Sequence, residues 1–448
     1  MRYTPHTADD KRRMLREIGL DSVEELFEQV PRSLRERARI RLPDGLSEPA
    51  VLRRLASLAA RNGAASGWSF FLGGGSYHHA IPGAVDAIVS RSEFATSYTP
   101  YQPEVSQGTL QALFEFQTLV CQLTGMEAAN AGVYDGASAA AEAVLMSRRV
   151  QPAGRRRVLV SRALHPQYRQ VIATYLANLE GLRLEEVGYD ASGVTDVAQL
   201  ADRLGDDALC AVVGYPNFFG AVENLEPLRA ACERAGAQLI SVTTEPLALG
   251  LLKPPGEFGV PIAVGEGQSL GVPMAFGGPG FGFFATQKKF IRSLPGRLVG
   301  ETVDVEGRRG FVLTLATREQ HIRREKATSN ICTSQTLCAL AATVYLSLLG
   351  RSGLRRLAEI NLSRAHRAEA LLAARAGLRR RFSAPFFNEF VVQSRDPEAL
   401  MRRCAEHKIV PGIPLGRWYP ELADAVLVCV TEMNEGEEIE KLATIAAA

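Results

Sequence analysis

RRVLVS (residues 156–161) begins the stretch that decides the fold, and GFGFFAT (280–286) ends it. Four further apolar or β-branched runs lie between them: LRLEEVGY (182–189), LCAVVGYP (209–216), QLISV (238–242) and PIAVG (261–265). Residues 166–178, 195–204 and 223–235 separate these runs with amphipathic, helix-length segments. Strands joined through helices build βαβ units, whose parallel strands lie between two helical layers. We therefore expect an α/β domain with a mostly parallel sheet.

The pattern changes on both sides of this stretch. Upstream, Asp21 and Ser22 precede VEELFEQV, and Ser47 with Pro49 opens a second helical run, which indicates short helices. Downstream, helical stretches at 330–349 and 353–378 are followed by strands at 386–393 and 425–430 and helices at 397–407 and 435–446. We predict an N-terminal helical arm (1–65), a large domain (66–350) and a small α+β domain (351–448).

Composition excludes several classes of partner. The 448 residues include 51 basic and 49 acidic side chains, a balance that gives no footprint for nucleic acid or an anionic membrane surface. Seven cysteines form no C-x-x-C pair, so we expect reduced, buried thiols and a cytoplasmic protein. The apolar stretch 337–349 is shorter than the roughly 20 residues of a membrane helix. No metal-ligand spacing is present.

Glycine-rich and helix-opening segments are the first candidates for a ligand site. In GVYDGASAAAEAVL (132–145), Asp135, Gly136 and Ser138 open an alanine-rich helix, and free N–H groups at such an end suit an anion. The same residues are equally typical of a simple helix cap. FLGGGSYHHAIP (71–82) and the glycines of 265–286 permit close backbone approach, either to a ligand or to another part of the chain.

Two further loops carry polar side chains. SYTPYQPEVSQGT (97–109) holds Tyr98, Tyr101 and Gln102 among prolines, which suits a ligand pocket or subunit interface, or else a loop packed on itself. REQHIRREKATSNICTSQ (318–335) places several cations, among them Lys326, before a predicted helix cap at Thr328, Ser329 and Asn330. Cations near a helix N-terminus are unfavourable without an anion, which favours an anion site over a solvated surface.

These strings, together with LLKPPGEFG and GQSLGVPMAFGGPGFGFFAT, resemble the P-protein family of the glycine cleavage system almost from end to end. The likeness is strongest to subunit 1, the N-terminal-half chain of P-proteins that bacteria divide in two. The resemblance implies a type I pyridoxal phosphate (PLP) transferase fold, like that of aspartate aminotransferase, with a large and a small domain.

The resemblance also implies a Schiff-base lysine, which this chain lacks at the matching place. There it reads Gly-Gln-Ser-Leu-Gly, with Gln268 and Ser269 before the GGPG turn. Of the seven lysines only Lys326 is a serious substitute, and its neighbours are charged rather than apolar. By the same resemblance His165 matches the ring-stacking position and Glu245 is the nearest carboxylate for the ring nitrogen. We expect no covalent catalytic residue and a vestigial cofactor cavity, formed by Asp135, Gly136, Ser138, His165, Glu245, Gln268 and Ser269.

The family then implies a subunit that pairs with a lysine-bearing subunit 2, as an α2β2 assembly, with PLP held by the partner. Glycine is the substrate, and the lipoylated H-protein receives the aminomethyl group. Tyr98, Tyr101, Gln102, Lys326, Thr328, Ser329 and Asn330 would complete the partner's site. Two alternatives stay open: an autonomous PLP aminotransferase or decarboxylase that uses Lys326 or Lys253, and a purely structural partner.

Overall fold

The computed structural model describes residues 5–38, 42–63, 67–96 and 98–447. Residue contacts divide the chain into two units, Met1–Ala64 and Ala65–Ala448. The predicted border at 65 and 66 lies outside the described residues, as does Ser97 of the tyrosine-containing segment. The first unit contains α1 (Ala8–Glu17), a 3-10 turn, α2 (Arg32–Arg37) and α3 (Glu48–Ala59), and these elements hold no buried residue.

A seven-stranded sheet with the order β2-β8-β7-β6-β5-β3-β4 forms the centre of the second unit. Its strands are β2 (Ala128–Ala129), β3 (Arg157–Ser161), β4 (Arg183–Val187), β5 (Ala208–Gly214), β6 (Gln238–Thr243), β7 (Ile262–Glu266) and β8 (Gly282–Thr286). All six predicted strands are confirmed, and β3 to β7 pair in parallel. The pattern did not predict that β8 runs antiparallel to β7, or that the short strand β2 extends the sheet beyond it.

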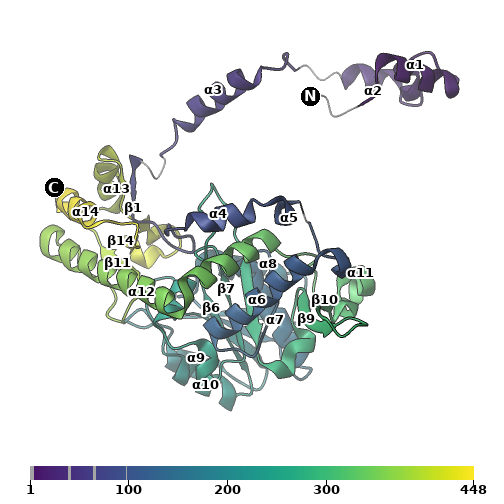
Figure 1. The fold of residues 1–448 in the computed structure, drawn as a ribbon. Helices are drawn as coiled ribbons and strands as arrows, with labels where there is room; N and C mark the ends of the chain where they lie inside the picture. The colour runs from purple at the N-terminus through teal and green to yellow at the C-terminus, as the bar shows by residue number, and fades with distance from the viewer. Residues whose placement is uncertain (1–4, 39–41, 64–66, 97, 448) are drawn as a thin grey trace. The chain divides into compact units, whose positions relative to one another are not determined.

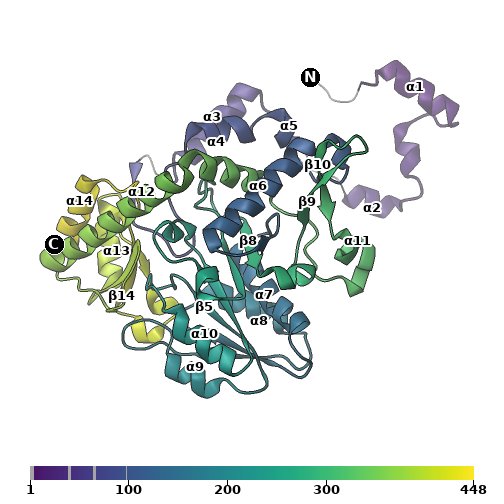
Figure 2. The same ribbon diagram turned by 60° about the horizontal axis from the view of Figure 1, so that its bottom comes forward.

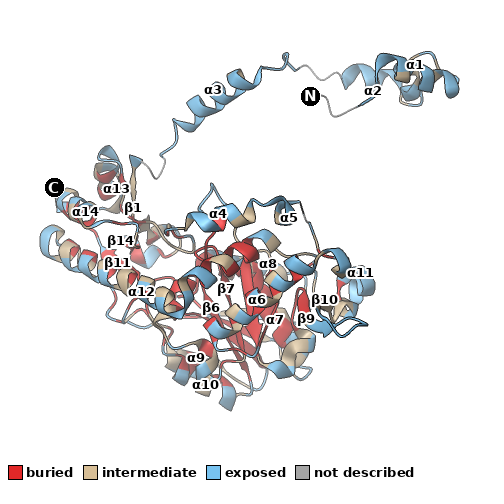
Figure 3. Cartoon of the chain, viewed as in Figure 1, coloured by how far each residue is buried: buried red, intermediate tan, exposed pale blue. Residues whose placement is uncertain are grey.

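Helices cover both faces of this sheet, because successive residues of a strand point to opposite sides. In β6, Ile240 packs with residues of α7 (Gly136–Val150) and α8 (Pro166–Leu176). Its neighbour Leu239 packs on the other side with α6 (Gln107–Thr124), α9 (Val197–Arg203) and α10 (Leu225–Arg234). Figure 3 shows the buried sheet between helices whose outer faces are exposed. The apolar runs are therefore buried on both faces, as a parallel sheet requires.

One long helix, α12 (Thr336–Ala376), links the large sheet to the C-terminal layer. It packs against α6 and α14 (Gly436–Ala447), and Figures 1 and 2 both show it crossing between the two parts. Two separate helices were predicted here, and the structure has two, which share the label α12 and meet at a kink at Gly350, where the backbone is non-helical. The helix also begins at Thr336, six residues after the predicted start.

By length and composition α12 is the only helix in the described ranges that could cross a membrane. The stretch 337–349, expected to be too short for a membrane helix, is only the part of α12 that precedes Gly350. Much of its apolar part is buried instead: Cys338 to Thr343 and Tyr345 to Leu346 lie in the interior, which is typical of a core helix.

A three-stranded antiparallel sheet, β11-β14-β13, forms the C-terminal layer. Its strands are β11 (Glu389–Gln393), β13 (Ile413–Pro414) and β14 (Ala425–Cys429), covered by α13 (Pro397–Glu406) and α14. These elements match the predicted strands and helices, while the domain border at 350 stays a prediction. A further antiparallel hairpin, β9 (Leu298–Val303) and β10 (Arg309–Thr314), was not predicted.

Candidate functional site

A pocket of about 600 Å³ opens beside the N-terminal ends of α7 and α8. Asp135 and His165, both predicted cavity residues, line it together with Glu266 and the glycine-rich segment at 74–76. The pocket lies where two helices begin, a position that suits an anion in many α/β proteins. The hydrogen bonds of the lining residues show whether these helix N-termini are free to bind an anion.

The N-terminus of α7 already carries a carboxylate from within the chain. Glu266, at the end of β7, accepts the N–H of Gly136 through Oε2 at 2.9 Å, and it accepts the N–H groups of Gln268 and Phe281 through Oε1. Burial raises the pKa of Glu266 to about 7, against the lowering effect of these bonds. Asp135 caps the helix by accepting the N–H of Ser138 at 2.6 Å, so the capping interpretation of this motif holds.

His165 lies at the start of α8, and both of its ring nitrogens are engaged. Nε2 donates to the carbonyl of Gly74 at 2.7 Å, and Nδ1 accepts the N–H of Gln167. Burial lowers the pKa of this histidine to about 4, so it is neutral at physiological pH. One edge of the ring faces Phe218 at 4.8 Å between centroids, and Gly75 lies close enough that a Cβ there would be 3.2 Å from the ring. The glycine-rich segment therefore packs directly on the predicted stacking residue.

Gln268, at the place of the missing lysine, is bonded to the same glycine-rich segment. Its Oε1 accepts the N–H of Tyr77 at 2.8 Å, and its Nε2 donates to the carbonyls of Tyr77 and Val272. The Tyr77 hydroxyl in turn donates to Glu389 at 2.8 Å, deep in the interior. Ser269 is also buried, and among the described atoms its hydroxyl has no hydrogen-bond partner. The side-chain amide of Gln268 thus has a structural role, since it connects Tyr77 to Val272.

Glu245, the nearest carboxylate to the expected ring nitrogen, pairs with a histidine of the chain itself. His79 Nε2 lies 2.8 Å from Glu245 Oε2, and His79 Nδ1 lies 2.8 Å from Glu432 Oε2. Burial lowers the pKa of His79, but the two carboxylates outweigh it and raise the pKa to about 10. The imidazolium therefore bridges two acids, and segment 71–82 connects the predicted cavity residues to one another.

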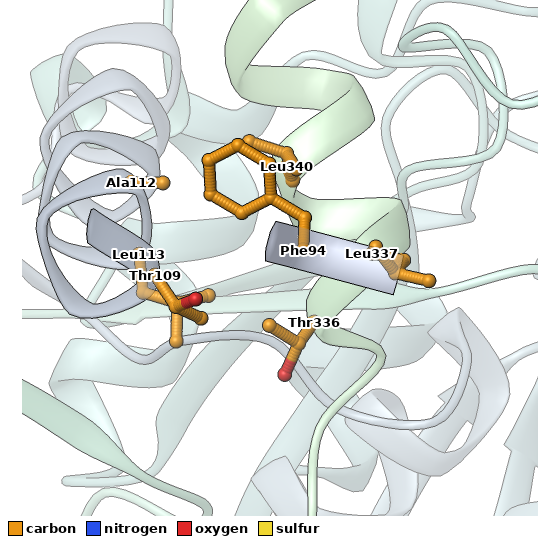
Figure 4. Close-up of a pocket in the computed structure, with 7 residues that line it drawn as sticks. All are labelled: Phe94, Thr109, Ala112, Leu113, Thr336, Leu337 and Leu340. Carbon is orange, nitrogen blue, oxygen red and sulfur yellow. The ribbon is translucent and has the colours of Figure 1, made fainter. Parts of the chain in front are cut away.

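The loop at residues 98–102, here called the tyrosine loop, lies on another part of the molecule. Tyr98 is 78% exposed, Tyr101 is 55% exposed, and Gln102 is exposed as well. Upstream, α5 (Ser92–Ala95) anchors the loop through Phe94; Figure 4 shows this ring beside Leu340 of α12 and facing α6. Downstream, Gln107 bonds the backbone of Phe311 in β10 in both directions, at 2.9 and 2.8 Å. The loop is thus held at both ends while its polar side chains face outward.

Tyr101 is fixed from beneath by a buried arginine. Arg297, the residue before β9, is 3% exposed and donates to the Tyr101 hydroxyl at 3.0 Å, with its guanidinium carbon 4.7 Å from the ring centroid. Its Nη2 also donates to the carbonyl of Cys332 at 2.5 Å. Thr99 and Thr333 approach within 3.3 Å. The tyrosine loop and the segment around residue 330 therefore meet, as the sequence suggested.

Several residues of segment 318–335 differ from expectation. Thr328, Ser329 and Asn330 do not cap α12, whose N-cap is Gln335 with no side-chain bond, because residues 330–335 form an irregular link. Ser329 accepts the N–H of Ile331 and interacts with the buried Glu142, while Asn330 and Lys326 are exposed. Arg318 donates to backbone carbonyls, including that of Gly296, and is thus used within the fold. Because α12 does not begin at residues 328–330, the argument that cations crowd a helix N-terminus there does not apply. The role of these residues in binding an anion stays a prediction.

Comparison with known proteins places the chain. The family model described as glycine cleavage system P-protein matches residues 1–446. A protein from Geobacillus thermodenitrificans named probable glycine dehydrogenase (decarboxylating) subunit 1 is 51% identical over 441 residues, which cover 98% of this chain and 97% of that protein.

The chain belongs to the glycine cleavage system P-protein family.

A second relative of the same name, from Anaeromyxobacter dehalogenans, is 51% identical over 99% of this chain and 98% of its own. A crystal structure of glycine decarboxylase (P-protein) in inhibitor-bound form superposes with a TM-score of 0.92 at 48% identity, over 100% of this chain and 99% of that one. A Burkholderia pseudomallei sphingosine-1-phosphate lyase, at 17% identity and a TM-score of 0.66 over 93% and 94% of the two chains, shares the fold. The predicted family and fold class are confirmed: this is a P-protein subunit 1 with a PLP-transferase fold.

Sequence reasoning missed the residues that are hydrogen-bonded, directly or through one another, to the predicted cavity residues of this P-protein. Glu266, His79, Tyr77 and Glu389 were not candidates, although GEG at 265–267 and YHH at 77–79 set polar residues inside glycine-rich or apolar surroundings. In the described parts of the chain no group of three or more His, Cys, Asp or Glu side chains is placed to hold a metal ion. The cysteines are free; Cys332 is exposed and Cys121 is half-buried, so the expectation that all are buried was wrong.

Proposed function

We propose that this P-protein chain works through a lysine-bearing partner subunit and completes the partner's active site with its tyrosine loop and the segment around residue 330. The relatives' name, subunit 1, implies a second subunit. PLP supplies the electron sink for glycine decarboxylation when bound in that partner. The complex passes the remaining aminomethyl group to the lipoyl group of the H-protein. The assembly is α2β2, and we expect it in the cytoplasm.

The hydrogen bonds of the predicted cavity residues do not fit PLP, which supports the proposal. A phosphate at the N-terminus of α7 would have to displace Glu266, which already takes the Gly136 N–H. Glu245 is engaged by His79, and by the family resemblance Gln268 stands where a Schiff-base amine would be needed. The groups that an anionic cofactor would need are therefore already bonded within the chain.

The tyrosine loop is the single observation that carries the composite-site proposal. Two tyrosines stand exposed on a loop whose ends are anchored, and a buried arginine fixes one of them at its hydroxyl. A rigid, exposed phenol costs little conformational entropy when it meets a ligand or a partner. By this proposal Tyr98, Tyr101, Gln102, Thr328, Ser329, Asn330 and Lys326 face the partner, where they bind the glycine carboxylate or exclude water.

Co-expression with the lysine-bearing subunit tests this function directly. Exchange of label between bicarbonate and glycine is expected only when both chains are present. Borohydride reduction and peptide mapping should place the pyridoxyl group on the partner alone; a pyridoxyl group on Lys326 or Lys253 would identify an autonomous PLP enzyme instead.

The Tyr101→Phe and Asn330→Ala variants separate an active role from a structural one. We expect each to lower exchange in a complex that gel filtration shows to be assembled. If both variants exchange label at the wild-type rate, this chain is a structural partner only. A matched control is Tyr189→Phe, whose hydroxyl donates to Glu421 and which should leave exchange unchanged.

A further inference from the structure

Arg297 occupies an unusual position for a charged residue. Its side chain is almost wholly buried, yet its nearest carboxylate, Glu319 Oε2, is 3.7 Å from Nε, beyond hydrogen-bond distance. In the described structure Arg297 Nε and Glu319 Oε1 are both buried without a hydrogen-bond partner. Buried ions are costly unless they are well paired, so this arrangement is not explained by stability alone. The guanidinium is instead committed to Tyr101 and Cys332.

The backbone holds Arg297 in place independently of its side chain. The N–H of Ala131 donates to the Arg297 carbonyl at 2.9 Å, which ties this residue to the segment after β2. Gly296, just before it, has φ +75°, a conformation that favours glycine. The backbone of Arg297 is thus fixed near β2, while its side chain reaches the exposed tyrosine loop.

Tyr101 is held on two sides by this cluster. Arg297 lies under one face of the ring, and His321 meets the ring edge-on at 6.3 Å between centroids. Glu319 lies behind both, 3.7 Å from Arg297 and 3.6 Å from His321 Nδ1. Because the Tyr101 oxygen accepts from Arg297, its own hydrogen is left to donate to a group outside the chain.

We propose that Arg297 is a positioning residue that orients the Tyr101 hydroxyl to donate a hydrogen bond to the substrate carboxylate in the partner's active site. This inference rests on the proposed composite site and adds a residue and a direction to it. Arg297 itself does not touch substrate. It acts by fixing the phenol and by placing a positive charge behind it, which favours an approaching anion.

The test uses the assembled two-subunit enzyme and compares Arg297→Met, Tyr101→Phe and the double variant. We expect Arg297→Met to raise the KM for glycine about tenfold with little change in kcat, since a charge-assisted hydrogen bond is lost. The double variant should be no worse than Tyr101→Phe, because Arg297 works through that hydroxyl. Arg297→Lys, which keeps the charge but loses the planar fork, should recover part of the affinity.

A control variant is Arg355→Met on α12, where the arginine is exposed and pairs with Glu359. It should leave KM and kcat unchanged. Two results would overturn the positioning role. In one, the KM increases caused by Arg297→Met and Tyr101→Phe multiply in the double variant. In the other, Arg297→Met lowers only kcat. A Tyr101→Phe variant with wild-type KM would instead overturn the composite site itself.

Discussion

His79 shows how a single buried residue can connect distant parts of this fold. Its ring joins Glu245 to Glu432, and Asn361 adds a bond to Glu432 at 2.9 Å. Burial raises the pKa of Glu432, but the bonds and charge of His79 outweigh it and lower that pKa to about 2. His79 and Glu432 are thus both charged over most of the pH range.

Replacing His79 by glutamine should reduce stability in a pH-dependent way. Histidine titrates near 6.5 when unfolded, and here its pKa is raised to about 10. Its contribution is therefore fully present below pH 6.5 and is lost as the pH rises through 10. We expect His79→Gln to lower the free energy of unfolding by about 3 kcal/mol at pH 6, and by clearly less at pH 10. Urea unfolding at the two pH values measures the difference.

His407→Gln is the matched control, because that histidine is exposed at the end of α13. Its effect should be small at both pH values. An equal loss of stability for His79→Gln at pH 6 and pH 10 would contradict the charged bridge.

Of the residues that the sequence predicted for the cavity, Asp135 and His165 line the pocket, but the hydrogen-bond partners of the predicted residues were not foreseen. Asp135, His165, Glu245 and Gln268 were recognisable from motifs. Their partners are far away along the chain: Glu266 is 130 positions from Gly136, and Glu432 is 353 from His79. Only the folded chain brings such pairs together, so no local pattern could predict them.

At the scale of elements, the turn after β5 joins the large sheet to the C-terminal layer. Ala221 forms an isolated bridge with Phe386, and the N–H of Val222 donates to the carbonyl of Pro385 at 2.8 Å. Gly220, with φ +77°, lies against the backbone of Glu389 in β11 so closely that a Cβ would overlap its carbonyl. This glycine is required both for its conformation and for the contact between elements.

Gly220→Ala should therefore cost more than an ordinary glycine replacement. A positive φ costs alanine about 1–2 kcal/mol, and the displaced β11 contact should bring the total to about 3–4 kcal/mol. Gly377→Ala provides the control: it has φ +65° at the end of α12 but no atom within 4 Å of a Cβ, so only the first cost applies. Equal urea midpoints for the two variants would show that the contact between Gly220 and the Glu389 backbone contributes nothing to the free energy of unfolding.

The elements were predicted where the hydrophobic pattern is strong. Most of the runs that became β3 to β8 are apolar or β-branched, with β4 the exception, whereas the hairpin β9–β10 is largely exposed or half-exposed and is interrupted by DVEGRR at its turn. The hydrophobic pattern also could not predict that β8 runs antiparallel to β7, because an apolar run does not show the direction of its strand. The start of α12 was misplaced because Thr-Ser-Asn is typical of a cap, while here the helix begins after a further irregular link.

For the whole molecule, the question is how many cofactors two chains of the same fold carry. This chain keeps the sheet, the helix N-termini and a pocket of about 600 Å³, but a carboxylate lies on the helix end that would receive a phosphate. We expect an assembled complex with one PLP per pair of chains. The ratio is measured from the spectrophotometric PLP content and the protein concentration. Two PLP molecules per pair of chains would contradict the inference that this chain's cavity does not hold PLP.

Inorganic phosphate offers an independent check on the isolated chain. A site that bound phosphate with a dissociation constant tenfold below the added concentration would stabilise the fold by about 1.4 kcal/mol, enough to raise the melting temperature by about 1.5 °C. Because Glu266 already takes the Gly136 N–H, we expect no shift between phosphate and chloride at matched ionic strength. A rise confined to phosphate, and larger in Glu266→Gln, which removes the competing carboxylate, would show that the anion displaces Glu266 from this N–H. The N-terminus of α7 would then be an open anion site, and the division of labour between the two subunits would have to rest on the missing lysine alone.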